Sequence, residues 1–253
     1  MTAQEIQSKY ANHILLDSRR RGETKVLAGD VMVIVVFVND PVSRWTERAK
    51  KDFCWNYFSA MKKIEAAARP YGVKLKLMNA FDEVELAMNC TMDNISAWTT
   101  QVVSKKGHTS IQSMQKDYKR LYNSDETPIV FAFNRKFRSY AQSADAMHPY
   151  GNEFCVASLD GSEKTIIHEL LHQFGAEDLY YPEQIRAVAD RYFPHSVMGG
   201  SVGDEIDPLT AYLIGWRESI DVRVEKVLEL TKHITYAHIQ AELDQIWKNS
   251  RKK

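Results

Sequence analysis

The amino-acid sequence predicts an α/β fold in layers: a twisted mixed β-sheet backed by helices, and a smaller, mainly helical C-terminal half. Three segments lead to this prediction. Residues 31–38 form an apolar run rich in β-branched side chains, which is typical of a strand buried on both faces. Residues 45–64 repeat apolar side chains every three or four positions, as an amphipathic helix does. Residues 73–77 alternate apolar residues with Lys, which fits a strand with one solvent-facing side.

The remaining elements alternate in a similar way. Further strands are expected at 128–133 and 154–159, and further helices at 109–122, 163–174, 183–191, 207–216 and 233–248. Residues 80–107 show no clear pattern.

No internal repeat or Gly/Ser linker interrupts the chain, so we expect a single domain over residues 1–253. Within it we expect an N-terminal surface extension (1–24), an upper subdomain (25–175) and a lower subdomain (176–253).

The charge composition argues against an electrostatic binding role. The 253 residues carry 33 basic and 33 acidic side chains, so no excess of one sign attracts the chain to nucleic acid or an anionic membrane. The strongest apolar run is about eight residues, far below the roughly 20 that span a bilayer. The three cysteines form no close pair, and the N-terminus does not resemble a signal peptide. A cytoplasmic protein is therefore expected, with secretion by another route as the alternative.

Residues 168–178 carry a pattern with a defined chemistry. They read His-Glu-Leu-Leu-His-Gln-Phe-Gly-Ala-Glu-Asp. On a helix, His168 and His172 lie one turn apart on the same face, so both imidazoles can bind one metal ion. Glu169 would then lie beside the metal, where its carboxylate can accept a proton from an attacking water.

The segment after the second histidine can complete the site. Catalytic zinc usually has three protein ligands, so two histidines are not enough. Gly175 can adopt a positive φ and end the helix, which lets the chain turn back and present the carboxylate of Asp178 as the third ligand. The adjacent Glu177 is the alternative ligand. At the other end of the helix, Asp160 and Glu163 have the spacing of a capping box.

The length of the pattern makes chance an unlikely origin. A His-Glu-x-x-His match alone is expected about 0.02 times in a chain of this composition, and the added Gly and acidic positions lower this to the order of 10⁻⁴. The competing interpretation is a core helix with two surface histidines and a glycine cap. The rarity of the full pattern favours a zinc site.

The motif resembles the zinc-binding signature of the metzincin peptidases, in the variant where Asp replaces the usual third His, as in the snapalysins. This resemblance implies a metzincin-like fold with zinc held by His168, His172 and Asp178. Metzincins also have a methionine-containing turn beneath the metal, and Met198 is placed to form it. The resemblance covers about residues 31–217, with specific motifs only around 168–198. Residues 175–181 also resemble the aspzincins, and Met198 favours the metzincins.

Some residues depart from the metzincin pattern. Several metzincins carry a Tyr two residues after the turn methionine, where this chain has Gly200. Tyr180, Tyr181 or His195 could stabilise an oxyanion instead, although each is expected to be structural. Cys155 could approach the metal as a thiolate, but its expected role is that of a small buried hydrophobic residue.

These features predict a zinc-dependent hydrolase, specifically a metalloendopeptidase. Its peptide or protein substrate is expected to pair with an edge strand near residues 153–159. A zinc hydrolase of a non-peptide amide or ester is the first alternative. The second is an inactive, metal-stabilised binding protein, against which the retained Glu169 argues. The oligomeric state is not predicted.

Overall fold

The computed structural model describes residues 1–145, 151–200 and 203–242, and it contains one mixed β-sheet. The strands are β1 (Gly29–Asn39), β2 (Leu75–Glu85), β3 (Ile129–Phe133), β4 (Tyr140–Gln142) and β5 (Phe154–Ser158). They lie in the order β2-β1-β3-β5-β4. All neighbouring strands pair in parallel except β4, which is antiparallel to β5. The predicted mixed sheet of an α/β fold is therefore confirmed.

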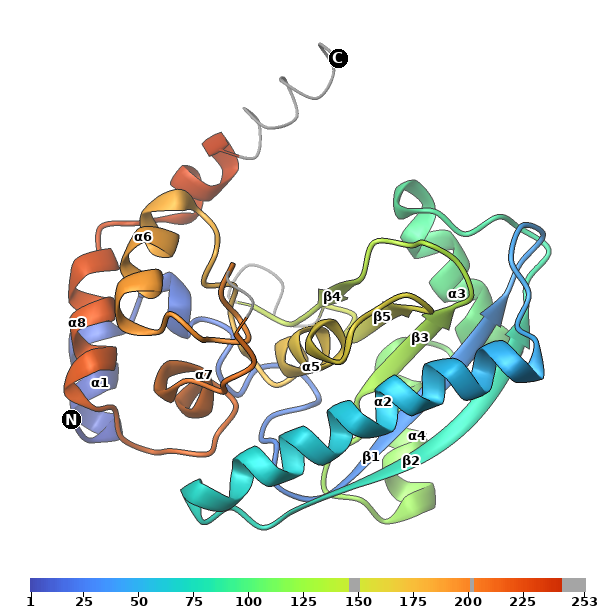
Figure 1. The fold of residues 1–253 in the computed structure, drawn as a ribbon, viewed down its shortest axis with the longest axis horizontal. Coiled ribbons are helices and arrows are strands. Elements are labelled where there is room, and N and C mark those ends of the chain that lie inside the picture. The colour runs from blue at the N-terminus through green and yellow to red at the C-terminus, as the bar shows by residue number, and fades with distance from the viewer. Residues whose placement is uncertain (146–150, 201–202, 243–253) are drawn as a thin grey trace.

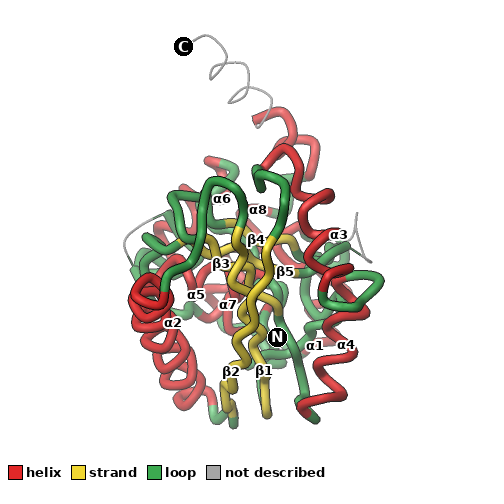
Figure 2. The backbone as a smooth tube through the Cα atoms, turned by 90° about the vertical axis from the view of Figure 1, so that its right-hand side faces the viewer, coloured by secondary structure: helices red, strands yellow, loops and turns green. Residues whose placement is uncertain are grey.

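Helices cover both faces of this sheet (Figure 2). On one face lie α2 (Glu47–Ala68) and α5 (Glu163–His172), and on the other lie α3 (Ile95–Lys105) and α4 (Ile111–Tyr122). Alternate residues of β1 are buried on opposite sides. Val33 belongs to the core cluster under α2 and α5, and Ile34 to the cluster under α3 and α4. This burial on two faces explains the continuous apolar run of β1.

A mainly helical half lies beside the sheet layers (Figure 1). It contains α6 (Glu183–Tyr192), α7 (Pro208–Leu213), α8 (Val222–Thr231) and, from the other end of the chain, α1 (Ala3–Tyr10). The Tyr10 hydroxyl donates to Glu229 at 2.8 Å, and Nε2 of His13 lies 3.0 Å from the carbonyl of Leu228. Residues 1–24 were expected to be a surface extension, but the part around Tyr10 and His13 contacts α8. The buried apolar side chains of this segment are Ile6, Tyr10, Ile14 and Leu15.

The chain differs from the sequence expectations in several elements. The strand expected at 73–77 continues to residue 85, so β2 and α3 occupy the region without a clear pattern. The helix expected at 207–216 is shorter, Pro208–Leu213, and α8 was not expected. Of the helix expected at 233–248, residues 236–242 are helical and residues 233–235 are not, while residues 243–248 lie outside the described residues.

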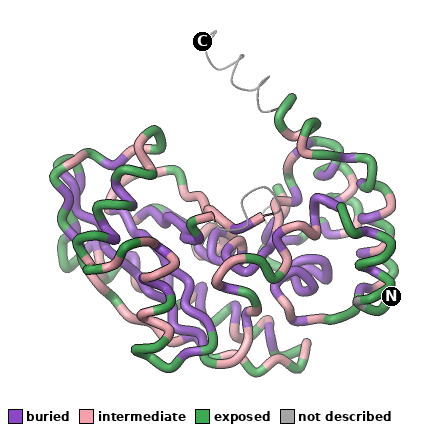
Figure 3. The backbone as a smooth tube through the Cα atoms, turned by 180° about the vertical axis from the view of Figure 1, so that it is seen from behind, coloured by how far each residue is buried: buried purple, intermediate pink, exposed green. Residues whose placement is uncertain are grey.

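Buried residues run from the sheet into the helical half (Figure 3). One core cluster contains Val33 of β1, Leu170 of α5 and Leu228 of α8. The helix α5 therefore lies between the two halves and packs against both. Over the described residues, the structure contains no helix with the length and apolar character needed to cross a membrane.

Candidate metal centre

The helix α5 begins at a serine cap. Ser162 has an extended backbone, and its hydroxyl accepts a hydrogen bond from the amide of Thr165 at 3.2 Å. The capping box expected at Asp160 and Glu163 is therefore wrong. Asp160 instead accepts a hydrogen bond from the hydroxyl of Ser158 at 2.7 Å, because it lies in the turn before the helix.

The end of α5 redirects the chain as predicted. Gly175 has a φ of 88°, and a Cβ atom at this position would lie 2.6 Å from the carbonyl oxygen of Ser18. The amide of Ala176 donates back to the carbonyl of Leu171 at 3.2 Å, which closes the last turn of the helix. Only glycine fits this conformation and this close contact. The turn brings Asp178 back toward the histidines.

Three potential ligand atoms converge at this point. Nε2 of His168 lies 3.2 Å from Nε2 of His172. Oδ1 of Asp178 lies 3.1 Å from the first of these nitrogens and 3.2 Å from the second. The structure thus brings together the three side chains that the sequence selected, with their donor atoms facing one another.

Backbone carbonyls orient both imidazole rings. Nδ1 of His168 lies 3.0 Å from the carbonyl oxygen of Val197, and Nδ1 of His172 lies 2.8 Å from that of Ala176. A carbonyl oxygen can only accept, so each Nδ1 carries the proton. Each Nε2 can therefore present a lone pair to a metal, as the outer contacts of zinc-binding histidines usually ensure.

The electrostatics of the three groups favour positive charge between them. Burial opposes the negative charge of Asp178, yet the two imidazoles hold the pKa of its carboxyl well below the usual range. Burial also opposes a proton on His172, but the carboxylate of Asp178 prevails and raises the pKa of His172 to about 9. The site therefore stabilises a cation at the point where the donor atoms meet.

The dimensions of this triangle fit a zinc ion. In a tetrahedral site with bonds of about 2.0 Å, neighbouring ligand atoms are about 3.3 Å apart. The three measured separations are 3.1, 3.2 and 3.2 Å. Oδ1 of Asp178 is also buried without a hydrogen-bond partner among the described residues, which a coordinated cation would remedy. Two nitrogens and one carboxylate oxygen are a ligand set that zinc accepts.

Glu169 lies beside the three donor atoms. Ligand atoms of His168, Glu169 and His172 are all within 4.8 Å of one another. The Glu169 side chain is 7% exposed. Burial raises the pKa of its carboxyl above the usual value, against the opposing effect of the two imidazoles. Glu169 is therefore a base that faces the donor triangle and is shielded from bulk water.

An open cavity of about 320 Å³ lies above these residues. The helix α5 and the segment after it supply His168, Glu169, His172, Glu177, Asp178 and Tyr180; the other wall consists of Arg138, Ser139, Tyr140, Ala141 and Ser143. This second wall includes β4. The prediction that residues 153–159 form the edge strand is wrong, because β5 is paired on both sides and β4 lies outside it.

Comparison with known proteins adds a general structural similarity. No family model and no curated protein matches the sequence. The fold is similar to that of a solved structure, metalloproteinase-II from Bacteroides fragilis, with a TM-score of 0.46 and 9% sequence identity. The alignment covers 83% of this chain, which spans only 60% of that protein. At this level the similarity carries no inference about metal, reaction or substrate.

The other candidate residues differ in their placement. Tyr180 lines the cavity, and its ring centroid lies 5.9 Å from that of His168. The Tyr181 hydroxyl donates to the carbonyl of Ile239 at 2.6 Å, and His195 is exposed and not part of the cavity wall. Of the three residues considered for oxyanion stabilisation, only Tyr180 is therefore within reach of the site.

Glu177 and Cys155, the two other residues considered near the metal, have different surroundings. Glu177 lines the cavity, and its carboxylate accepts a hydrogen bond from the hydroxyl of Ser18. Asp178, in contrast, contacts both imidazoles directly. Cys155 is 2% exposed, and burial raises the pKa of its thiol well above the usual value. It is a buried core residue, as expected.

Several residues of the site had no signal in the sequence. The carbonyls of Ala176 and Val197 act through the backbone, which any residue type provides. Arg138 and β4 belong to a short segment whose pattern indicates neither helix nor strand. Only the folded chain brings this segment to the cavity.

Proposed function

We propose that this chain is a zinc-dependent metallopeptidase of the metzincin type. The observation that carries the proposal is the convergence of Nε2 of His168, Nε2 of His172 and Oδ1 of Asp178 beside the buried Glu169. A purely structural zinc site would use four protein ligands and would not need a neighbouring base. Three ligands, a base and an open cavity favour hydrolysis.

Each residue has a defined part in this reaction. Zinc held at this triangle supplies Lewis acidity, which lowers the pKa of water and polarises a carbonyl group. Glu169 takes the proton of the attacking water and returns it to the leaving amine. His168 and His172 keep their Nδ1 protons on backbone carbonyls, so their Nε2 lone pairs stay directed at the same point.

The strand β4 provides a docking edge for an extended peptide. Among the described strands it pairs only with β5, so its other edge can offer main-chain hydrogen bonds. Its residues Tyr140 and Ala141 line the same cavity as Glu169. A peptide that adds to β4 would therefore pass over the catalytic carboxylate.

The segment around Met198 supports the metzincin type. Met198 is fully buried, and its carbonyl accepts a hydrogen bond from the amide of Leu179 at 2.9 Å. The preceding carbonyl, of Val197, accepts from His168. This turn thus contacts the proposed ligand His168. It also contacts Leu179, which directly follows the proposed ligand Asp178, as a turn beneath the metal would.

The test compares hydrolysis of fluorescein-labelled casein by the zinc-loaded wild type, Glu169→Gln and Glu163→Gln. Glu163 is on the same helix, outside the cavity, so it serves as the matched control. We expect Glu169→Gln to retain zinc and lose at least about 10²-fold in turnover, the lower range for removal of a general base. Glu163→Gln should stay near the wild-type rate.

The outcome also separates the alternatives. A Glu169→Gln protein that cleaves casein at the wild-type rate contradicts the mechanism. A zinc-loaded wild type that hydrolyses small amides or esters but no peptide would favour the non-peptide hydrolase. Tight zinc with no hydrolysis of any kind would favour a binding protein.

A further inference from the structure

The wall of the cavity carries the guanidinium group of Arg138. Arg138 lies two residues before β4 and is exposed at the cavity. Within residues 1–145, 151–200 and 203–242 it forms no ion pair or hydrogen bond. Arg138 lines the same cavity as the proposed base Glu169.

The carboxylates that line the cavity form no ion pair with Arg138 in the described part of the chain. Asp178 contacts the two imidazoles, and Glu177 accepts from Ser18. Glu169 is buried beside the rings and lies beyond ion-pair distance of Arg138. The described chain thus supplies no partner for the positive charge of Arg138, although this charge faces the substrate cavity.

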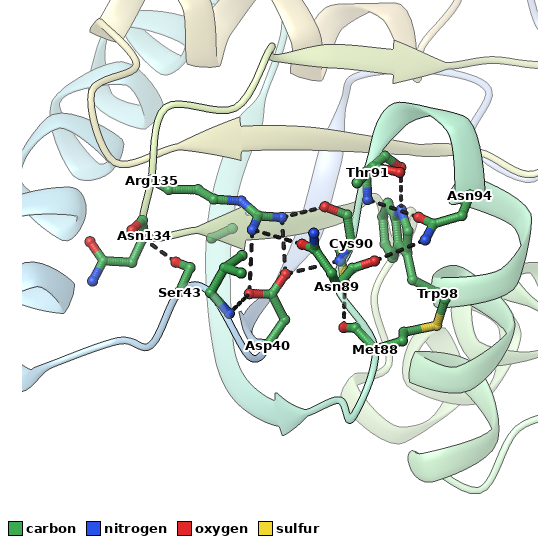
Figure 4. A network of polar contacts seen from close by, with 12 residues as sticks. Asp40, Ser43, Met88, Asn89, Cys90, Thr91, Asn94, Trp98, Asn134 and Arg135 are labelled. Carbon is green, nitrogen blue, oxygen red and sulfur yellow. Dashed lines mark hydrogen bonds and ion pairs between the residues drawn. The ribbon is translucent and has the colours of Figure 1, made fainter.

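The loop that carries Arg138 is nevertheless held firmly in place (Figure 4). Arg135 forms an ion pair with the buried Asp40 at 2.9 Å, and the same carboxylate accepts from the amide of Cys90 at 3.0 Å. The guanidinium of Arg135 also lies over the ring of Phe137, 5.2 Å from its centroid. These contacts fix the backbone immediately before Arg138.

A neighbouring contact fixes the beginning of the same loop. The carbonyl of Asn134 accepts from the hydroxyl of Ser43 at 2.9 Å, and its side-chain amide donates to the carbonyl of Arg44 at 2.6 Å. The loop from residue 134 to residue 137 is thus tied to the segment that follows β1, residues 40–44. A fixed backbone that carries a guanidinium with no partner among the described residues is an arrangement prepared for an anionic ligand.

We propose that Arg138 binds a carboxylate of the substrate, so that the site selects peptides with a negative charge close to the cleaved bond. This inference rests on the proposed peptidase function. The planar guanidinium matches a carboxylate through two parallel hydrogen bonds. In a peptide, this carboxylate comes from an Asp or Glu side chain or from a free C-terminus.

The experiment measures binding, so that it does not depend on turnover. Zinc-loaded Glu169→Gln protein is incubated with acetylated random hexapeptides in which one position at a time is fixed as Glu, as Gln or as Lys. All of these peptides have amidated C-termini. A second pool has random positions and either a free or an amidated C-terminus. Retained peptides are quantified by mass spectrometry.

Three further proteins carry a second substitution in the Glu169→Gln background. Arg138→Met removes the guanidinium, and Arg138→Glu reverses its charge. Lys136→Met is the matched control, because Lys136 is an exposed cation of the same loop and does not line the cavity.

We expect retention of the carboxylate peptides to exceed that of the matched amides by about 10- to 100-fold, as for a charge-assisted hydrogen-bonded pair. A preference for Glu over Gln identifies a side chain as the source, and a preference for the free C-terminus identifies the α-carboxylate. Arg138→Met should abolish the preference and Lys136→Met should keep it. Arg138→Glu should favour pools with Lys over those with Gln.

Two results would overturn the proposal. The first is that no pool shows a preference for carboxylate peptides over the matched amides, which includes the case in which no pool binds. The second is a carboxylate preference that persists in Arg138→Met. Both are distinct from failure of the peptidase function. Peptide hydrolysis without carboxylate preference removes only the role of Arg138. If the wild type cleaves no peptide but binding of carboxylate peptides still depends on Arg138, only the proposed peptidase function is contradicted.

Discussion

Nδ1 of His168 and the carbonyl oxygen of Val197 lie 3.0 Å apart, across 29 residues of sequence. This contact connects α5 to the turn that contains Met198. The turn is itself fixed: the hydroxyl of Ser196 donates to Asp207 at 2.6 Å and accepts from the amide of Met198 at 3.0 Å. Asp207 caps α7, so the orientation of His168 depends on the packing of the helical half.

Substitutions of Met198 test this dependence. Its side chain is completely buried, so Met198→Leu, which conserves volume and apolarity, should cost less than about 1.5 kcal/mol of stability and should retain zinc. Met198→Glu places an unpaired charge in the core, which should lower both the melting temperature and the zinc content. Thermal unfolding and elemental analysis check both. A Met198→Glu protein equal to the wild type would contradict the role of this turn.

Removing the buried partner of Arg135 should loosen the opposite wall of the cavity. Asp40→Asn keeps the shape of the side chain but removes its charge, leaving the guanidinium of Arg135 without its counterion. We expect a loss of about 2–3 kcal/mol in the free energy of unfolding, measured by urea denaturation. The exposed Asp52→Asn is the control and should change stability by less than about 0.5 kcal/mol. Equal stability of the two variants would argue against the network.

A buried carboxyl away from the site predicts a pH effect. Glu153 is 1% exposed, and burial raises the pKa of its carboxyl to about 7. Because the folded pKa exceeds the unfolded one, its contribution to stability is complete below about pH 4.5 and is lost as the pH rises through about 7. Glu153→Gln cannot ionise, so its stability relative to the wild type should improve with rising pH.

The size of this change follows from the shift. Between pH 5 and pH 8, the difference in unfolding free energy between Glu153→Gln and the wild type should move by about 2–3 kcal/mol in favour of the variant. Urea denaturation at both pH values measures it. Glu47→Gln, whose side chain is 84% exposed in the native protein, should show no such trend. A difference independent of pH would mean that Glu153 titrates normally.

The fold could be predicted where burial leaves a clear pattern. The strand β1 is buried on both faces and α2 on one, so their apolar residues follow regular spacings. The strand β2 lies at the edge of the sheet. Its second half carries the polar residues Asn79, Asp82 and Glu83 at partly or fully exposed positions, which hides the alternation of apolar and polar residues typical of a strand. Three residues are too few for β4 to show any period.

The site could be predicted as far as its ligands are local in sequence. One helix carries both His168 and His172, and the turn at Gly175 brings Asp178 back toward them, so the convergence of the three side chains follows from local geometry. The contacts of Val197 and Arg138 with the site depend on how distant segments pack, which no local spacing encodes. The same limit applies to α1, whose apolar face was visible but whose partner α8 was not.

The central claim concerns the metal, and zinc K-edge X-ray absorption together with elemental analysis of protein purified without chelators tests it most directly. We predict one zinc per chain, with two imidazole nitrogens at about 2.0–2.1 Å and a carboxylate oxygen at about 2.0–2.2 Å. Asp178→Ala should lose this zinc on dialysis, whereas Glu177→Gln should keep it. A purified protein without stoichiometric metal, or zinc that survives Asp178→Ala but not Glu177→Gln, would contradict the proposed site.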